Sequence, residues 1–390
     1  MTAPLTGMTW DHPRGYRVLD ALADHDRREA AAGRPGPRPV VWKRHSLEDF
    51  EARPLRAFCD DTDLVVLDHP GLGEAVADGC LRPLETLFTA GELAALRRSC
   101  VGPSHDSYHL DGSQWALAVD AATQVSVARQ DTAGGRPGSW EDACAEVRRT
   151  PSALCLGGPH AFLMFAALCV ALGAAPFPDG DPDRVADLAT GTAALEVMAE
   201  LLAHSDPDLS WRNPIAVLDA MSGDGGPQYC PLVYGYVTYQ APGPGRTGLR
   251  AFDAPRGPGG VRGSVLGGVG LAVTRSCQDL PAARAQLLRL LSPGVQTDDY
   301  RRFGGQSSLA EAWDDETVHR AVHGFYRDTR RTMDAAWTRP RFPGYIGFQQ
   351  QASAAVRDGL SHRTPPARVL AQLDTLLRTA RAGTRTGGMS

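Results

Sequence analysis

Two related stretches decide the fold: LVVLDHPGLG at residues 64–73 and LTGMTWDHPRG at residues 5–15. Each places an Asp-His-Pro turn directly after an apolar run of the kind that forms a buried strand. In an α/β protein, ligands bind outside the carboxyl ends of the strands, so two such turns could face one cleft. The sequence therefore predicts a binding site at these turns.

Strand and helix signals alternate around the two turns. Strands are expected at residues 5–10, 40–42 and 64–67, and a helix through Leu19 and Leu22 follows the first of them. This order is typical of a βαβαβ unit with a parallel sheet. The glycines of residues 71–73 open a further helix whose N-terminus favours an anion, but two glycines are a weak phosphate signal.

A second α/β unit follows a long β-like stretch at residues 115–127, which is expected to cross between two lobes. Asn213-Pro214 has the pattern of a helix start, with a capping side chain before a first-turn proline. The glycine- and proline-rich residues 241–263 indicate an exposed loop or mobile flap. The other expected elements are a strand at 153–156, a helix at 162–172, a tyrosine-rich strand at 229–239, a returning strand at 264–274 and mainly helices from residue 300.

Length and composition place the chain among globular proteins. Its 390 residues exceed the size of one core, so two lobes are expected. The first should comprise residues 1–120 and 263–305. The second should comprise residues 121–262 and 306–390, with C-terminal helices. The net charge of -5 supplies no basic surface, which argues against a nucleic-acid partner.

The start of the chain bears on its location. The first nine residues carry neither a basic region nor an apolar region, and no apolar run in the sequence reaches membrane-spanning length. These features predict a cytoplasmic protein without a membrane segment.

Cysteine and metal-ligand patterns point to no cofactor. The eight cysteines are scattered without a Cys-x-x-Cys pair, so most are expected to be buried, reduced residues. There is no His-x-x-x-His or His-Glu-x-x-His pattern and no Gly-x-Ser-x-Gly elbow, so neither a metal nor a serine nucleophile is expected. A pair of Cys230 with His69 would need geometric support.

The candidate catalytic residues are those of the two turns, His69, Asp68, His12 and Asp11. A histidine titrates near neutral pH, and a neighbouring carboxylate fixes its tautomer or raises its basicity, as acid–base catalysis requires. His69 is the first choice because it follows the most apolar strand. The alternative is that each aspartate caps the following turn and each histidine hydrogen-bonds the loop.

Seven further residues are candidates for ligand binding. Aromatic rings would form a stacking wall, and alternation along a strand puts positions 234 and 236 on one face. The alternatives are a hinge residue or an arginine partner for position 120, a surface or packing residue for position 160, and ordinary core for the tyrosines. The candidates are Trp10, Arg14, Asp120, His160, Tyr229, Tyr234 and Tyr236.

An ordered set of loose motifs supports a resemblance. These are residues 9–10, 64–73 (LVVLDHPGLG), 108–120 (YHLDGSQWALAVD), 139–142 (SWED), 157–160 (GGPH), 229–236 (YCPLVYGY), 267–268 (GG) and 339–342 (RPRF). Together they resemble family-1 extracellular solute-binding proteins of ABC transporters over most of the chain. The resemblance implies a type II periplasmic-binding-protein fold: two α/β lobes joined by crossover strands, with the ligand clamped in a cleft between them. It also implies that the first and third strands are neighbours.

Two functions remain open. In the first, the chain binds a small polar or aromatic molecule, and an ABC permease is a partner only if the chain is exported. In the second, the same fold is an intracellular enzyme of lyase, isomerase or cyclase type that uses the Asp-His pairs, because fold does not fix function. Family resemblance favours binding, whereas the missing export signal favours the enzyme.

Overall fold

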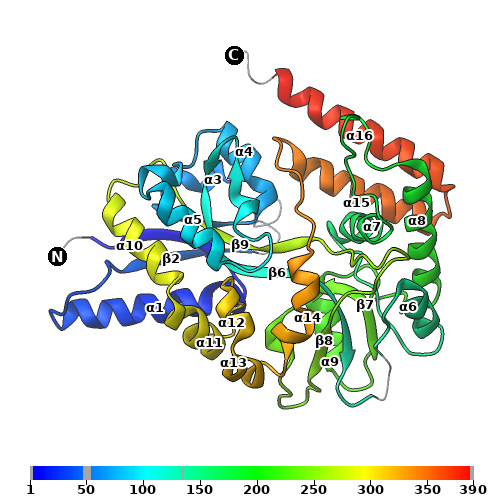
Figure 1. The fold of residues 1–390 in the computed structure, drawn as a ribbon, viewed down its shortest axis with the longest axis horizontal. Coiled ribbons are helices and arrows are strands. Elements are labelled where there is room, and N and C mark those ends of the chain that lie inside the picture. The colour runs from blue at the N-terminus through cyan, green and yellow to red at the C-terminus, as the bar shows by residue number, and fades with distance from the viewer. Residues whose placement is uncertain (1–2, 47–53, 133–135, 387–390) are drawn as a thin grey trace. The chain divides into compact units, whose positions relative to one another are not determined.

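The computed structural model describes residues 3–46, 54–132 and 136–386, with the elements labelled in Figure 1. The chain forms two compact units. Unit 1 comprises Met1–Ala121, Gly267–Ala321 and Arg339–Pro343, and unit 2 comprises Ala122–Leu266, Val322–Thr338 and Gly344–Ser390.

The sheet of unit 1 begins as the sequence predicts. Strand β1 (Leu5–Trp10) pairs in parallel with β2 (Val40–His45) and with β3 (Leu64–Leu67). The expected parallel arrangement and the expected neighbourhood of the first and third strands are therefore confirmed. Strand β9 (Leu266–Val273) then pairs antiparallel with β3, which makes the sheet mixed. Because β1 and β3 run in parallel, the turns that follow them lie at the same edge of the sheet.

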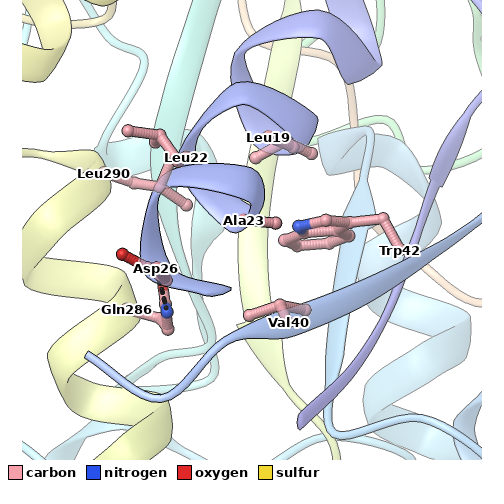
Figure 2. A pocket seen from close by; sticks show the side chains of 8 residues that line it. All are labelled: Leu19, Leu22, Ala23, Asp26, Val40, Trp42, Gln286 and Leu290. Carbon is pink, nitrogen blue, oxygen red and sulfur yellow. Dashed lines mark hydrogen bonds between the residues drawn. The ribbon is translucent and has the colours of Figure 1, made fainter. Parts of the chain in front are cut away.

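Helix α1 (Pro13–Ala31) buries one face, which includes Leu19 and Leu22. Between α1, β2 and α10 (Leu280–Leu290) lies a small pocket, shown in Figure 2. The space that water can occupy there is about 10 Å³, enough for about one water molecule. The pocket is therefore a packing gap rather than a ligand site. Among its described residues, unit 1 has six further α-helices: α3 (Arg56–Cys59), α4 (Leu72–Ala77), α5 (Ala90–Ser99), α11 (Tyr300–Phe303), α12 (Ala310–Asp314) and α13 (Glu316–Ala321).

In unit 2 the sheet is built on the second half of β6 (Ala116–Arg129). Strands β7 (Tyr229–Tyr234) and β8 (Leu249–Phe252) both pair antiparallel with it. Helix α7 (His160–Ala171) is buried along almost its whole length and packs against α8 (Leu188–Ala203) and α15 (Tyr345–Ser361). The other helices are α6 (Trp140–Val147), α9 (Pro214–Ser222), α14 (Phe325–Asp334) and α16 (Pro366–Thr386).

Three expected elements of unit 2 differ in the structure. Residues 153–156 are buried but form no strand, because the segment meets β7 only at an isolated bridge between Ser152 and Tyr229. The predicted strand 229–239 ends at Tyr234, and residues 237–239 form a 3-10 turn. The predicted flap at 241–263 contains β8, whose Leu249 and Ala251 are buried.

After residue 266 the chain contributes segments alternately to unit 1 and unit 2. The boundary within β6 falls between Ala121 and Ala122, beside the expected one. Residues 306–321, expected in the second lobe, cluster instead with unit 1. The reason is visible in hydrogen bonds: the Ser308 hydroxyl donates to the Ala118 carbonyl (2.7 Å), and Ser307 forms a bridge with Asp120.

Candidate functional site

The first Asp-His-Pro turn is a helix start. The Nδ1 atom of His12 accepts a hydrogen bond from the Arg14 backbone N–H (3.2 Å), so His12 caps α1. The His12 ring stacks on Trp10 at 5.1 Å between centroids. Asp11 is exposed and lies 3.6 Å from Arg44. This copy therefore follows the capping alternative, with the histidine rather than the aspartate as the cap.

The second turn forms a charged cluster in unit 1. His69 is fully buried, and its Nδ1 atom lies 3.1 Å from an Asp68 carboxylate oxygen. The other carboxylate oxygen accepts a hydrogen bond from Arg339 at 2.7 Å. The His69 ring meets the Tyr108 ring edge-on at 6.3 Å. Of the three charged or titratable partners, Asp68 is the most exposed, with 28% of its side chain accessible against 4% for Arg339.

Protonation in this cluster follows from its charges. Burial raises the pKa of Asp68, but Arg339 and His69 outweigh it and hold that pKa at about 2. Burial, followed by the charge of Arg339, lowers the pKa of His69 to about 4. At neutral pH Asp68 is therefore an anion and His69 is a neutral ring.

The Nδ1 atom of the neutral His69 ring lies close to Asp68 without the geometry of a hydrogen bond. Its buried Nε2 atom likewise has no hydrogen-bond partner among the described residues. A general base works best when its pKa lies near the working pH, and it must reach the substrate. Because of its low pKa and complete burial, His69 is better suited to orienting Asp68 than to transferring a proton.

Arg339 was not among the residues predicted for the site, although its motif was noted. It begins the segment Arg339–Pro343, which joins unit 1 from a distant part of the chain. Arg341 in this segment donates hydrogen bonds to the carbonyls of Ser107 (2.8 Å) and His109 (3.0 Å). The sequence signal for this segment is the pattern Arg-Pro-Arg-Phe-Pro at residues 339–343.

The segment also explains the glycines of residues 71–73. A Cβ atom on Gly73 would lie 1.7 Å from the Arg341 carbonyl oxygen, whereas one on Gly71 would meet open space. Gly73 is thus needed for the close approach of two backbones. Packing accounts for this glycine without a phosphate ligand.

Arg14 and Asp120 form a buried ion pair in unit 1. The Arg14 Nε donates to one carboxylate oxygen of Asp120 at 2.8 Å, and Arg14 Nη2 donates to the other. Their side chains are only 4% and 6% exposed. Of the interpretations of Asp120, the arginine partner is therefore the one found in the structure.

The candidates in unit 2 lie in its core. His160 begins α7, is 4% exposed and meets Tyr234 edge-on at 5.8 Å. Tyr229 is buried in β7, and Tyr236 packs edge-on against Tyr239 at 6.3 Å. Because β7 ends at Tyr234, the predicted sharing of one strand face by Tyr234 and Tyr236 is wrong. The wall that was to combine these rings with Trp10 stays a prediction.

An aromatic pair in unit 2 was missed. The rings of Phe177 and Trp337 are parallel within 9° at 6.2 Å, and both are half-buried. Phe177 has a φ of +61°, which is rare for a bulky residue. The buried rings of Tyr345 and Phe348 contact it at 6.3 and 5.8 Å. The core thus holds a partly exposed aromatic surface in place. The only sequence signal is the prolines on both sides of Phe177.

Known structures resemble the whole chain. Maltose-bound T. maritima MalE3 superposes with a TM-score of 0.79 at 14% identity, over 97% of this chain and 100% of the other. An ABC transporter solute-binding protein from Agrobacterium radiobacter K84 in complex with ribitol gives 0.77 at 16%, over 97% and 98%. The cyclic α-maltosyl-1,6-maltose binding protein from Arthrobacter globiformis gives 0.75 at 16%, over 97% and 99%. The chain has a solute-binding-protein fold.

No protein-family model matches the sequence, and no curated protein matches it at a significant level. The solute-binding-protein fold therefore rests on structure, and the expected type II architecture is confirmed at that level. The predicted position of a ligand between the lobes and the roles of individual residues stay predictions.

Cys230, metal-ligand groups and apolar helices are the remaining features to place in the structure. Cys230 is completely buried, and burial raises the pKa of its thiol to about 12, so it is not an activated nucleophile. In the part of the chain that the structure describes, no three His, Cys, Asp or Glu residues are grouped to hold a metal ion. Within the same residues no helix is long and apolar enough to cross a membrane.

Proposed function

We propose that this protein binds a small, neutral polyhydroxylated molecule of the sugar or polyol class. The observation that carries the proposal is the partly exposed Asp68 carboxylate at the carboxyl end of β3, held between Arg339 and His69. An ionised carboxylate accepts hydrogen bonds strongly, and a guanidinium donates them. A hydroxyl group both donates and accepts, so it matches such a pair.

The charge balance supports a neutral ligand. Arg339 compensates Asp68 within the cluster, so neither an anion nor a cation gains a full opposite charge there. Within unit 2, the Phe177–Trp337 surface is an aromatic face of the kind on which the apolar C–H groups of a sugar stack. The structural neighbours agree with this class, since two of them are complexes with maltose and with ribitol.

His69 acts in this proposal as a positioning residue for Asp68. Acid–base catalysis by His69 would require its ring to titrate near neutral pH, and burial beside Arg339 lowers its pKa instead. The lowered pKa of His69 therefore favours the binding proposal over acid–base catalysis by this residue. Cytoplasmic location stays a prediction, and we propose an ABC permease as partner only for an exported form.

The test is calorimetric titration with maltose, ribitol and tagatose, followed by analysis of the recovered ligand by NMR. At least one compound should bind and be recovered unchanged. Asp68→Asn should weaken that binding by about 10- to 150-fold, the value of a charged hydrogen bond of roughly 1.5–3 kcal/mol.

Asp24→Asn is the matched control, because Asp24 is an exposed residue of α1 paired only with Arg27 at the surface. It should bind like the wild type. Absence of binding by all three compounds at millimolar concentration would contradict the proposal. So would equal affinity of the Asp68→Asn variant, and a chemically altered ligand would instead support the enzyme.

A further inference from the structure

Two of the cysteines lie in one apolar cluster of unit 1. Cys59 ends the short helix α3, and Cys80 follows α4. They are 3% and 6% exposed and belong to the cluster that also contains Val65, Leu72 and Leu81. The proposed ligand binding uses neither of them.

The backbone holds both cysteines against one short segment. The Arg275 N–H donates to the Cys80 carbonyl at 2.8 Å, and the Ser276 hydroxyl donates to the Cys59 carbonyl at 2.7 Å. Arg275 and Ser276 are consecutive, so they fix the two cysteine backbones close to each other. Asp78 and Arg56, an ion pair with 4.0 Å between their charged atoms, join the same two segments at the surface.

The two thiols also interact with each other. Burial, and then the neighbouring Cys80 thiol, raises the pKa of Cys59, and burial raises that of Cys80. Both groups are therefore neutral, unreactive thiols while unit 1 is folded. Any oxidation must take place while unit 1 is folding or transiently open.

We propose that Cys59 and Cys80 form an intramolecular disulfide when the chain folds in oxidising surroundings. The oxidant is a low-molecular-weight disulfide. One cysteine thiolate attacks it, forms a mixed disulfide and releases one small thiol; the second cysteine then attacks the protein sulfur and releases the other. The cysteines lose two electrons and two protons, and the small disulfide gains them. This proposal does not depend on the identity of the ligand.

The experiment refolds the full chain from urea with oxidised glutathione, removes the glutathione, unfolds the protein again in urea to alkylate the free thiols, and digests with trypsin. Trypsin does not cut between Arg82 and Pro83, so residues 57–97 form one peptide whose only cysteines are Cys59 and Cys80. We expect this peptide to lack alkylation and to be lighter than the reduced peptide by two hydrogen atoms. The closed loop should raise the thermal midpoint by roughly 5 °C relative to the reduced protein.

Variants separate this pair from the other cysteines. In Cys59→Ala, Cys80 should become alkylatable, and the gain in thermal midpoint should disappear. Cys144→Ser, which changes a half-buried cysteine outside the pair, should still form the bond. If both cysteines of the wild-type peptide remain alkylatable after refolding, or if either is linked to a different cysteine, the inference is wrong.

Discussion

The buried pair of Arg14 and Asp120 yields a quantitative prediction. Asp120→Asn keeps the shape of the side chain but removes its charge. Arg14 would then remain 96% buried without the Asp120 carboxylate, and the new amide N–H₂ would point at a guanidinium that can only donate. The variant therefore removes the negative charge of Asp120 from a buried guanidinium and also removes a hydrogen bond to it.

The magnitude follows from burial. Removing one partner of a buried ion pair costs about 3–5 kcal/mol, whereas an exposed pair is worth about 1 kcal/mol or less. With side chains 4% and 6% exposed, this pair belongs to the first class. The double variant Arg14→Met, Asp120→Leu removes both charges, so it should cost less than Asp120→Asn alone.

Hydrogen exchange measured by mass spectrometry in increasing urea is the suitable assay, because it reports each unit separately. Peptides from α1 and the first half of β6 should lose about 3 kcal/mol of protection in Asp120→Asn. Peptides from α16 in unit 2 serve as the internal reference. A loss below about 1 kcal/mol, the exposed-pair value, would refute the reasoning, as would a double variant less stable than the single one.

Two further predictions follow from the cluster around β3. The pKa of His69 is about 4 in the folded protein against an ordinary 6.5, so between these values the unfolded chain binds more protons than the folded one. The neutral, buried His69 therefore contributes about 3 kcal/mol to the free energy of unfolding above pH 6.5, and this contribution is lost as the pH falls to 4. In His69→Gln, the free energy of unfolding measured in urea should depend less on pH over that range. An unchanged pH dependence would contradict the lowered pKa assigned to His69. Gly73→Ala should destabilise unit 1 by several kcal/mol, because a Cβ there meets backbone at 1.7 Å, whereas Gly71→Ala should cost less than about 1 kcal/mol. Thermal melts of the two alanine variants make the comparison, and equal midpoints would contradict it.

The elements set by local pattern could be predicted from the sequence. The expected strands at 5–10 and 64–67 coincide with β1 and β3, and the expected cap of Asn213 accepts the Ala216 N–H at 2.9 Å in α9. Periodicity and capping residues act within a few positions, so they are legible in one sequence. The expected strand at 153–156 is absent because a strand needs one partner strand along its length. This segment has an isolated bridge from Ser152 to Tyr229, and its Leu156 N–H donates elsewhere, to the Ser210 carbonyl.

The missed site residues depend on contacts that no local pattern encodes. Arg339 reaches Asp68 across 271 positions of sequence. Phe177 adopts a left-handed backbone and stacks on Trp337, which lies 160 positions later. The Arg14–Asp120 pair was open as one of several interpretations, because spacing alone does not show which arginine a carboxylate meets.

The two Asp-His-Pro turns show how such distant partners decide chemistry. Both turns follow parallel strands of one sheet, and in both a proline follows the histidine, so the local sequence pattern is the same. After the first turn α1 begins at once, and His12 is used as its cap while Asp11 remains in solvent. At the second turn, Arg339 donates a hydrogen bond to the Asp68 carboxylate, and Tyr108 packs against the His69 ring. His69 is therefore buried and neutral, and Asp68 is ionised. The repeated motif thus marks the carboxyl ends of the strands at which a site can form. The contact with Arg339, which is distant in sequence, determines that the second copy carries a partly buried ion pair.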